Sequence, residues 1–416
     1  MRLLHVAHNF PPEFEGGTER YLLRLSLSLA ARGHQVFVAC GSEELSPGGE
    51  AVSFEYRGIP GVRLHRLPGE TYGILPSHPR MAGLVLEAAR KLGAQVVHLH
   101  HWFHLDTSLV RTLREAGFPV VVTFHDFYPL CPRFFRVRPG EEDPCPPDLG
   151  LEVCESCLAP EAGGTREERL ALLEERTRNF SREIRAAGEL VAFSRALAGF
   201  YRDWPYFPSG REIRVLPPGL PGGGAWEGGA GGDPGGPPWK VGSWGGVCRA
   251  KGQDLLVEAL SGETFAGLVE LHLWGPVLEP AFAEGLRRRA ESRGLPLFLH
   301  GSVPWEELPR AVSSLAVAVF PSRCFETYGL AVDEALVLGL PLVVSARGAL
   351  PERLGPGGRT FRPGDPEDLA RVLEEILLSP GGPRALRGLP HGVPDFSRHL
   401  EEMEALYRRE AAEDEA

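Results

Sequence analysis

The sequence has no long hydrophobic run, little lysine and no excess of basic charge. No stretch approaches the roughly eighteen uninterrupted apolar residues that a membrane-spanning helix needs, and the N-terminal segment MRLLHVAHNF lacks a signal-peptide cleavage pattern. We therefore expect a cytoplasmic protein. The formal net charge of -11 at pH 7 also argues against nucleic acid as a partner, because phosphate backbones require a basic surface.

The length and composition indicate more than one domain. The chain has 416 residues, of which 43% are hydrophobic, so it can bury large cores. One ordinary domain is shorter than this, and two domains are the natural expectation.

Short apolar runs in the first half alternate with longer amphipathic segments. Four runs have the composition of buried parallel strands: RLLHVAH, HQVFVAC, AQVVHLH and PVVVTFH. After the first of them, TERYLLRLSLSLAARG places Leu22, Leu25 and Leu29 on one face at helical spacing and ends at Gly33. Alternating strands and helices predict a doubly wound, Rossmann-like α/β sheet.

The alternation stops at a stretch rich in glycine and proline, LPGGGAWEGGAGGDPGGPPWKVGSW, and then resumes. That stretch predicts a linker or mobile loop. Five further strand-like runs follow: KVGSWGG, VELHLWG, LFLHG, AVAVFPS and LPLVVSA. We therefore expect two tandem Rossmann-like domains at residues 1–205 and 206–392, with a Cys-rich insertion at 131–160 in the first. Residues 393–416 have the pattern of a C-terminal helix.

Two adjacent glycines, Gly16 and Gly17, lie between the first strand and its helix, which Thr18 could cap. Ligands of such sheets bind beyond the carboxyl ends of the strands. Glycines let a phosphate or a sugar approach the backbone, and a helix N-terminus favours negative charge. A plain strand-to-helix turn explains the same pattern.

Two carboxylates eight residues apart, Glu326 and Glu334, flank the start of a predicted helix. Tyr328, Gly329 and Leu330 open this helix, whose free amides could hold a diphosphate. Carboxylates are poor neighbours for phosphate but good acceptors for hydroxyls. The arrangement therefore suits a ligand with a hydroxyl-rich group at each end, such as a nucleotide sugar. From spacing alone, an ordinary amphipathic helix with solvated acids is the better explanation.

The segment that contains both glutamates, FPSRCFETYGLAVDEALVLGLPLVV, resembles the glutamate-x-seven-glutamate signature of retaining GT-B glycosyltransferases, the large bacterial mannosyl- and glucosyltransferase group called glycosyl transferases group 1. The likeness spans nearly the whole chain. Its other motifs, in order, are PPEFEGGTERYLLRLSLSLAARGHQVFV, VVVTFHDF, VAFSRALAGFY, IRVLPPGL, GGVCRAKGQDLLVEAL, RGALPERL and GDPEDLARVLEEIL. The resemblance implies a GT-B architecture with an N-terminal acceptor domain, a C-terminal donor domain, a central cleft and a final helix that crosses back to the N-terminal domain.

The resemblance also implies roles for residues of the donor domain. Glu326 would bind hydroxyls of the transferred sugar, and Glu334 would bind the ribose. Backbone amides near Gly329 and Leu330 would hold the diphosphate. Lys251 matches the basic residue of the family's KG motif and would neutralise the leaving phosphate.

One position departs from the family pattern. Many relatives have an arginine five residues before the KG lysine, where this chain has Gly246. Arg249 could supply the missing charge from the same loop, or it could point to solvent. The departure puts the affinity for the donor in doubt, but not the class of reaction.

In the first domain, the resemblance implies that Gly16 and Gly17 approach the donor and that His125 faces the reacting sugar. His125 ends a buried strand and precedes an aspartate. A histidine in such a position can also be a hydrogen-bonded core residue, so both roles fit the sequence.

Further histidines lie in the motif HLHHWFH. His101 and Trp102 could line the acceptor pocket, or they could simply pack in the core. His98, His100 and His104 are near, but alternation along a strand divides these histidines between its two faces. This argues against a single metal cage.

The activity that the resemblance implies is transfer of a hexose from a UDP- or GDP-sugar to a hydroxyl of a glycan, lipid-linked or small-molecule acceptor, with retention at the anomeric carbon. In front-face attack the departing phosphate takes the acceptor proton. No catalytic cofactor or divalent metal is expected, because lysine and helix amides can stabilise the leaving group. A non-catalytic sugar-nucleotide-binding or regulatory protein, or a GT-B sugar-nucleotide epimerase, is the alternative. The presence of Glu326, Glu334, Lys251 and His125 favours the transferase.

Relatives often act on lipid-linked or polysaccharide acceptors at the inner membrane face. The segment REERLALLEERTRNFSREIRAAG has several arginines that could make transient contact with anionic lipid at that surface. It also has many glutamates, which favour a solvated helix.

Four of the seven cysteines fall within one stretch that is rich in proline and charge and cannot form much core of its own. They are Cys131, Cys145, Cys154 and Cys157. Four thiolates, two of them in a C-x-x-C knuckle, can form a tetrahedral structural zinc site that clamps the insertion. An iron–sulfur cluster would use the same ligands, and the same cysteines could instead form disulfides or remain free thiols.

Overall fold

The computed structural model describes residues 1–413 except 70–73, 76–77, 142, 221–232 and 390. The chain divides into two compact units. The first consists of Met1–Pro139, Cys145–Pro218 and Ser397–Ala416, and the second of Gly140–Pro144 and Gly219–Phe396.

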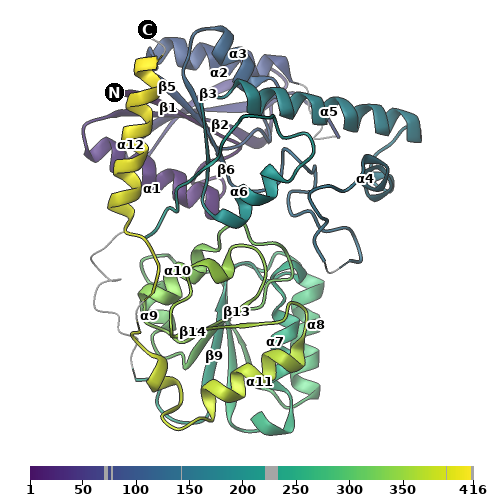
Figure 1. The fold of residues 1–416 in the computed structure, drawn as a ribbon, viewed down its shortest axis with the longest axis vertical. Coiled ribbons are helices and arrows are strands. Elements are labelled where there is room, and N and C mark those ends of the chain that lie inside the picture. Colours follow the sequence, from purple (N-terminus) through teal and green to yellow (C-terminus); the bar gives the residue numbers. More distant parts are fainter. Residues whose placement is uncertain (70–73, 76–77, 142, 221–232, 390, 414–416) are drawn as a thin grey trace. The chain divides into compact units, whose positions relative to one another are not determined.

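The first unit is built on an eight-stranded sheet with the strand order β3-β4-β2-β1-β5-β6-β7-β8 (Figure 1). Its strands are parallel except for the antiparallel pair β3 and β4. The inner strands β5 and β6 are buried along their whole length, because helices cover both faces of the sheet. The strands are β1 (Arg2–Ala7), β2 (Gln35–Leu45), β3 (Ala51–Tyr56), β4 (Ile59–Arg66), β5 (Val96–Leu99), β6 (Val120–Phe124), β7 (Glu189–Ala192) and β8 (Arg214–Val215).

The helices of the first unit bury the apolar stripe that the sequence predicts. In α1, Leu22, Leu25 and Leu29 are fully buried, and Leu22 packs in one cluster with Val38 of β2. Helices with one such stripe gain most of their stability from packing on the sheet. The helices are α1 (Gly17–Ala31), α2 (Pro79–Leu92), α3 (Leu109–Glu115), α4 (Leu151–Leu158), α5 (Arg166–Ala186) and α6 (Arg195–Arg202).

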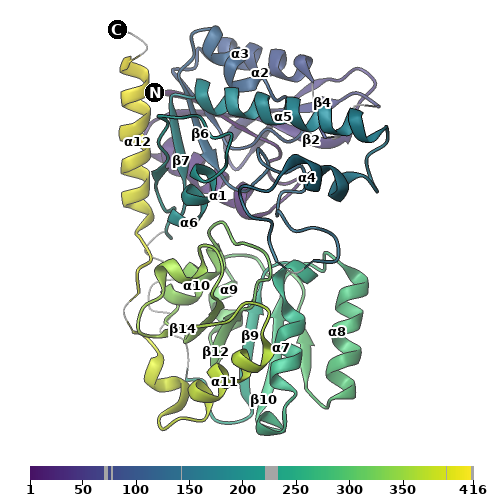
Figure 2. The same ribbon diagram turned by 45° about the vertical axis from the view of Figure 1, so that its right-hand side comes forward.

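The C-terminal helix α12 (Phe396–Glu413) packs on the first unit, beside which it runs in Figures 1 and 2. The hydroxyl of Tyr407 lies 2.7 Å from Nδ1 of His98 in β5, and Nε2 of His399 lies 2.8 Å from the hydroxyl of Tyr21 in α1. Its apolar stripe is buried, as the sequence predicts: Leu400, Met403 and Leu406.

The second unit has a fully parallel six-stranded sheet with the order β11-β10-β9-β12-β13-β14. Two apolar clusters cover its opposite faces. Val317 and Val319 of β12 belong to one and Ala318 and Phe320 to the other, as alternation along a strand requires. The strands are β9 (Trp239–Trp244), β10 (Val269–Trp274), β11 (Leu297–Leu299), β12 (Val317–Phe320), β13 (Leu342–Ser345) and β14 (Gly358–Phe361).

The helices of the second unit divide between these two clusters. Residues of α7, α8 and α11 belong to one cluster, and residues of α9 and α10 belong to the other. The helices are α7 (Gln253–Leu260), α8 (Pro280–Ser292), α9 (Leu308–Val312), α10 (Leu330–Val337) and α11 (Pro366–Leu377).

The structure confirms a doubly wound α/β sheet in each half of the chain and every strand predicted above. The division between the units falls after Pro218 and not after residue 205, because β8 pairs with β7 in the first sheet. Residues 221–232 of the predicted linker lie outside the described residues. Within the described chain, no helix combines the length and the apolar character that crossing a membrane requires.

Candidate functional site

Two predicted residues of the second unit meet where neighbouring strands leave the sheet. β9 and β12 are parallel neighbours, but the chain passes from β9 to β10 on one side and later reaches β12 on the other. This reversal is the topological switch point, beyond which open α/β sheets bind ligands. Lys251 follows β9 and Glu326 follows β12, so the topology places both at this point.

Backbone contacts hold the loops after β9 and β12 side by side. The amides of Arg323 and Cys324 donate to the carbonyl of Ala250, at 3.0 and 3.2 Å. Gly252 has a φ of +69°, and a Cβ there would lie 2.2 Å from the carbonyl oxygen of Pro321. Only glycine fits this crossing, so the glycine of the KG motif positions the lysine before it.

Lys251 and Glu326 form an ion pair in which Nζ lies 2.6 Å from Oε1. The hydroxyl of Ser322 donates to the same oxygen at 2.7 Å. Burial alone would lower the pKa of Lys251 and raise that of Glu326, but their mutual attraction outweighs burial. The pKa of the lysine is raised and that of the glutamate is lowered. The site therefore presents a cation and a carboxylate together at neutral pH.

A third loop holds the backbone of Glu326. The amide of Ala349 donates to the carbonyl of Glu326 at 2.9 Å. Gly348 has a φ of +60°, and a Cβ there would lie 2.4 Å from this carbonyl oxygen. The two residues belong to RGALPERL, a motif that carries part of the resemblance but for which the sequence predicted no role.

Glu334 lies about one turn into α10 and is buried, so it is not the solvated acid of an ordinary amphipathic helix. Each of its carboxylate oxygens accepts a hydrogen bond from a tryptophan. Nε1 of Trp244 lies 2.7 Å from Oε2, and Nε1 of Trp305 lies 3.1 Å from Oε1. These bonds fix the orientation of the carboxylate, and a carboxylate oxygen can accept more than one hydrogen bond. Neither tryptophan was predicted from the sequence to belong to the site.

The start of α10 matches the predicted position for a diphosphate. The helix begins at Leu330 and follows Gly329, whose φ is +82°. Amides of the first turn have no acceptor within a helix. The side chain of Tyr328 is buried, its hydroxyl donates to Asp333 at 2.5 Å, and the guanidinium of Arg353 lies 3.8 Å from its ring centroid. This side chain therefore stabilises the loop, and Arg353 also donates to the carbonyl of Tyr328 at 2.7 Å.

Arg249 is exposed, and its guanidinium lies 5.9 Å from the ring centroid of Phe282 in α8. Its amide donates to Glu279 at 3.2 Å. The side chain thus stacks on α8, which agrees better with a structural role than with a phosphate contact. At Gly246, a Cβ would lie 2.5 Å from Cδ1 of Leu278, so an arginine there would require this leucine to move.

The first sheet also has a switch point, between β1 and β5. His8 follows β1, while His101 follows β5. Nε2 of His8 lies 3.0 Å from Oε1 of Glu19, a buried residue of α1. The other oxygen of Glu19 accepts from the amide of Gly16 at 2.9 Å. Neither His8 nor Glu19 was predicted as a site residue, although both lie in or beside the motif that carries the two glycines.

The helix after β1 begins two residues earlier than a cap at Thr18 would place it. Its N-cap is Gly16, and Gly17 is the first helical residue. The prediction that Thr18 caps this helix is therefore wrong, because Glu19 reaches back to the N-cap amide instead.

His125 belongs to a chain of three hydrogen-bonded imidazoles. Its Nε2 lies 3.1 Å from Nδ1 of His100, whose Nε2 lies 3.0 Å from Nδ1 of His5. Burial lowers the pKa of His125 to about 3, although the charge of Asp126 opposes this shift. His125 is thus a neutral hydrogen-bonding group at pH 7.

His101 and Trp102 have different surroundings despite being adjacent. Nδ1 of His101 accepts a hydrogen bond from the amide of Phe103 at 2.9 Å, so the ring proton is on Nε2. Nε2 donates it to the carboxylate of Asp126 at 3.0 Å. The indole of Trp102 is buried and donates to Glu183 of α5 at 3.0 Å. His101 therefore lies at the strand end with Asp126, whereas Trp102 packs under α5 as a core residue.

A group of buried histidines has ligand atoms within 4.8 Å of one another: His5, His98 and His100. Hydrogen bonds already use both nitrogens of His98, to Tyr407 at 2.7 Å and to Thr123 at 2.8 Å. Both nitrogens of His100 are also used, in hydrogen bonds to His5 and His125. A metal ion would have to break these bonds, so the group is better explained as a neutral core network.

Both halves of the chain match models of glycosyltransferase families. Residues 15–221 match Glycosyltransferase Family 4, and residues 239–379 match Glycosyl transferases group 1. The second range contains Lys251, Glu326 and Glu334, and the first contains His125.

Curated relatives match a short segment. An MMP alpha-(1->4)-mannosyltransferase from Mycolicibacterium hassiacum is 42% identical over 87 residues, which are 20% of this chain and 20% of the relative. The sulfoquinovosyl transferase SQD2 of Arabidopsis thaliana is 38% identical over 89 residues, 20% of this chain and 17% of the relative. The chain thus spans about a fifth of the length of these curated relatives.

Solved structures match over nearly the whole chain. A sucrose-phosphate synthase from Thermosynechococcus elongatus has a TM-score of 0.67 at 19% identity, covering 98% of this chain and 99% of that one. HepE from Anabaena, in complex with UDP and glucose, has a TM-score of 0.63 at 16% identity, covering 98% and 100%. With its two parallel-sheet domains and both family matches, the chain is a member of the glycosyltransferases of GT-B architecture.

Proposed function

We propose that this protein is a retaining glycosyltransferase that moves a hexose from a nucleoside-diphosphate sugar to a hydroxyl of a glycan, lipid-linked or small-molecule acceptor. The observation that carries the proposal is the ion pair between Lys251 and Glu326, at the switch point of the group 1 domain. A partly buried cation next to a carboxylate offers one group for a phosphate and one for sugar hydroxyls.

The donor is held by groups that complement its parts. Lys251 and the first amides of α10 bind the diphosphate and stabilise its charge as it leaves. Glu326 accepts hydrogen bonds from the transferred sugar. Glu334, already oriented by two indoles, accepts from the ribose hydroxyls. Ribose is common to UDP and GDP, so this contact serves either nucleotide.

The names of similar proteins guide the choice of donor to test first. HepE was solved with UDP and glucose, and a structural neighbour from Burkholderia vietnamiensis is named a UDP-forming trehalose-phosphate synthase. The curated relatives include mannosyltransferases. We therefore place UDP-glucose and GDP-mannose first among candidate donors.

The acceptor side of the reaction is assigned to the carboxyl edge of the first sheet. Neutral His125 and the pair of His101 with Asp126 offer hydrogen bonds to sugar hydroxyls. The acceptor hydroxyl attacks the anomeric carbon on the face that the diphosphate leaves, and the departing phosphate oxygen takes its proton. Retention follows from this geometry, and Lys251 provides the positive charge that a divalent ion would otherwise supply. We place the reaction in the cytoplasm.

The proposal is tested by incubating the protein with single nucleotide sugars, with and without a panel of sugar and lipid-linked acceptors. We expect release of nucleoside diphosphate that depends on an acceptor, a product with the donor's anomeric configuration, and activity that survives EDTA. An inverted product would contradict the mechanism. A changed nucleotide sugar without transfer would indicate an epimerase.

A further inference from the structure

The four clustered cysteines line one pocket of the first unit. Cys131 lies in the loop after β6, Cys145 in the following insertion, and Cys154 and Cys157 in α4. The last two are three residues apart, so they share a helix face. The topology thus brings together four sulfurs that are widely spaced in the sequence, in a pocket with about 30 Å³ of free space.

All four are free thiols, so disulfides do not account for the cluster. Each is half-buried. Separate backbone bonds hold the loop that carries two of them. The amide of Cys131 donates to the carbonyl of Phe127 at 2.8 Å, and that of Cys145 donates to the carbonyl of Arg136 at 2.6 Å. The four cysteines therefore line one pocket whose loop is held in place by backbone bonds.

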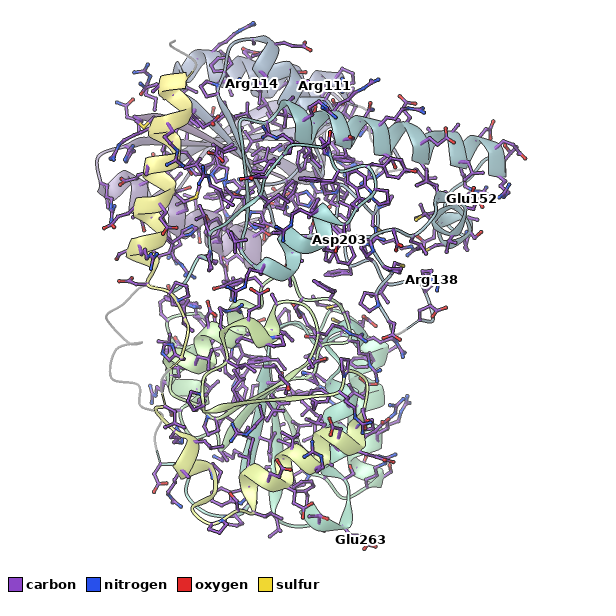
Figure 3. The ribbon with its side chains drawn as sticks, viewed as in Figure 1. Arg111, Arg114, Arg138, Glu152, Asp203 and Glu263 are labelled. Atoms are coloured by element: carbon purple, nitrogen blue, oxygen red, sulfur yellow. The ribbon has the colours of Figure 1, made fainter. Side chains whose placement is uncertain are left out.

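Arginines surround the same pocket. Arg133, Arg136, Arg138 and Arg176 line it, and Figure 3 labels Arg138 in the loop together with Glu152 of α4. Arg176 is buried, with a relative exposure of 2%. Its Nε and that of Arg133 have no hydrogen-bond partner among the described residues. Buried N–H groups without an acceptor cost free energy, and an anionic ligand would satisfy them.

We propose that this pocket binds an iron–sulfur cluster through the thiolates of Cys131, Cys145, Cys154 and Cys157. Four thiolates around a metal centre carry net negative charge, which the arginines neutralise, and the sulfurs of such a centre accept N–H hydrogen bonds. The proposed ligands are the four cysteines that the sequence predicts for a metal site. Zinc and an iron–sulfur cluster differ in the separation that they require between the sulfurs.

The spacing of the sulfurs favours a cluster over a single zinc ion. With Zn–S bonds of about 2.3 Å, tetrahedral zinc would hold its sulfurs about 3.8 Å apart. In the described part of the chain, the cysteines form no group of three whose ligand atoms lie within 4.8 Å of one another. A cluster of several irons and sulfides spans a larger space, and the wider separation of these cysteines fits it better than one ion.

The cluster would tie the loop after β6 to α4. That loop begins directly after His125 and Asp126, and the amide of Tyr128 donates to Asp126 at 2.8 Å. Cys131 follows three residues later. We therefore assign the centre a structural role that fixes this loop beside the candidate acceptor site. The inference is independent of the proposed transfer reaction.

The test is metal and sulfide analysis of protein purified from iron-replete cells without oxygen, chelator or affinity tag. We expect about four irons and four sulfides per chain, with visible absorbance that dithionite bleaches. Cys154→Ser with Cys157→Ser should lose both, whereas Cys40→Ala, a buried cysteine outside the pocket, should keep them.

Alkylation of the wild-type protein keeps the test valid if the double variant fails to fold. We expect the four pocket thiols to resist iodoacetamide until the iron is removed. One zinc per chain without iron would overturn the cluster. Four thiols that react at once, in protein without iron or zinc, would overturn the metal site.

Discussion

Nζ of Lys251 and Oε1 of Glu326 lie 2.6 Å apart, joined across the two neighbouring strands β9 and β12. Their pairing depends on a glycine, Gly252, that lets the two loops cross, and on the backbone of Ala349, which holds the glutamate from the other side. In the proposed reaction each member of the pair binds a different part of the donor. The lysine binds the diphosphate, and the carboxylate binds the transferred sugar.

Removing either charge of this pair should slow transfer while the fold persists. We expect Lys251→Met and Glu326→Gln each to lower kcat by about 100-fold, the usual loss when a charged contact to a leaving group is removed. Steady-state nucleotide release measures the effect, with circular dichroism to check the fold. Lys91→Met, at an exposed ion pair of α2, is the matched control and should retain wild-type kcat. A Lys251 variant with wild-type kcat would remove this residue from the mechanism.

Trp305 should act through Glu334. Trp305→Phe keeps an aromatic ring but removes the N–H that lies 3.1 Å from Oε1 of the carboxylate. Without this orienting bond, Glu334 should hold ribose less well. We expect the KM for the donor to rise about tenfold, or about 1.4 kcal/mol, with little change in kcat.

The control for this effect is Trp239→Phe, at a tryptophan of the second unit's apolar core. It should lower the melting temperature without changing KM. If Trp305→Phe changes stability but leaves KM at the wild-type value, the indole supports packing alone.

The bond between Tyr407 and His98 should stabilise the first unit. Tyr407→Phe removes the hydroxyl that lies 2.7 Å from Nδ1 of a fully buried histidine. An unpaired buried polar atom costs about 1–3 kcal/mol, so the free energy of unfolding should fall by that amount. Urea titration measures it. Tyr206→Phe, at an exposed tyrosine, should change stability by less than about 0.5 kcal/mol. Equal effects of the two variants would contradict the assigned bond.

The neutral histidines should make the first unit sensitive to acid. Burial lowers the pKa of His5 and of His125 to about 3, from 6.5. Below pH 6.5 the unfolded chain therefore binds protons that the folded chain does not, and stability falls as pH falls. Each such histidine contributes up to about 1.4 kcal/mol per pH unit.

The slope is best measured between about pH 5 and 6.5, above the range in which most carboxylates titrate. Burial raises the pKa of Glu183 to about 7, so this group also titrates there, and the comparison is made between two proteins that both contain it. His5→Leu should lower stability at neutral pH, because His100 loses a partner at 3.0 Å. Its pH slope should nevertheless be shallower than that of the wild type by about one proton. An unchanged slope would show that His5 is not neutral in the folded protein.

Much of the fold could be predicted because buried parallel strands are continuous apolar runs. Five strands escape prediction: β3, β4, β7, β8 and β14. β3 has no buried residue, and the two residues of β8 are too few to show a periodicity. The boundary between the two units depends on β8, which pairs with β7 from an earlier part of the chain. Such a pairing is a tertiary contact, which local sequence patterns do not predict.

The candidate site was predictable where a residue type follows a strand in a recognisable motif, as with Lys251 and Glu326. The groups that hold the site residues were not, since Gly348 packs on Glu326 and Trp305 binds Glu334 from loops elsewhere in the second unit. In the first unit, Glu19 binds His8 from the following helix and was missed for the same reason. Trp102 shows the converse, because it is next to His101 in the sequence but packs under α5. Of two adjacent residues at a strand end, one can belong to the candidate site and the other to the hydrophobic core.

The central claim is transfer of a sugar with retention from a nucleoside-diphosphate donor, and nuclear magnetic resonance of the product tests it most directly. UDP-glucose and GDP-mannose, each an α-anomer, are supplied with an acceptor that supports nucleotide release, to the wild-type protein and to Lys251→Met. We predict an α-linked product from the wild type and about 100-fold less from the variant. A β-linked product, or equal amounts from both proteins, would contradict the account.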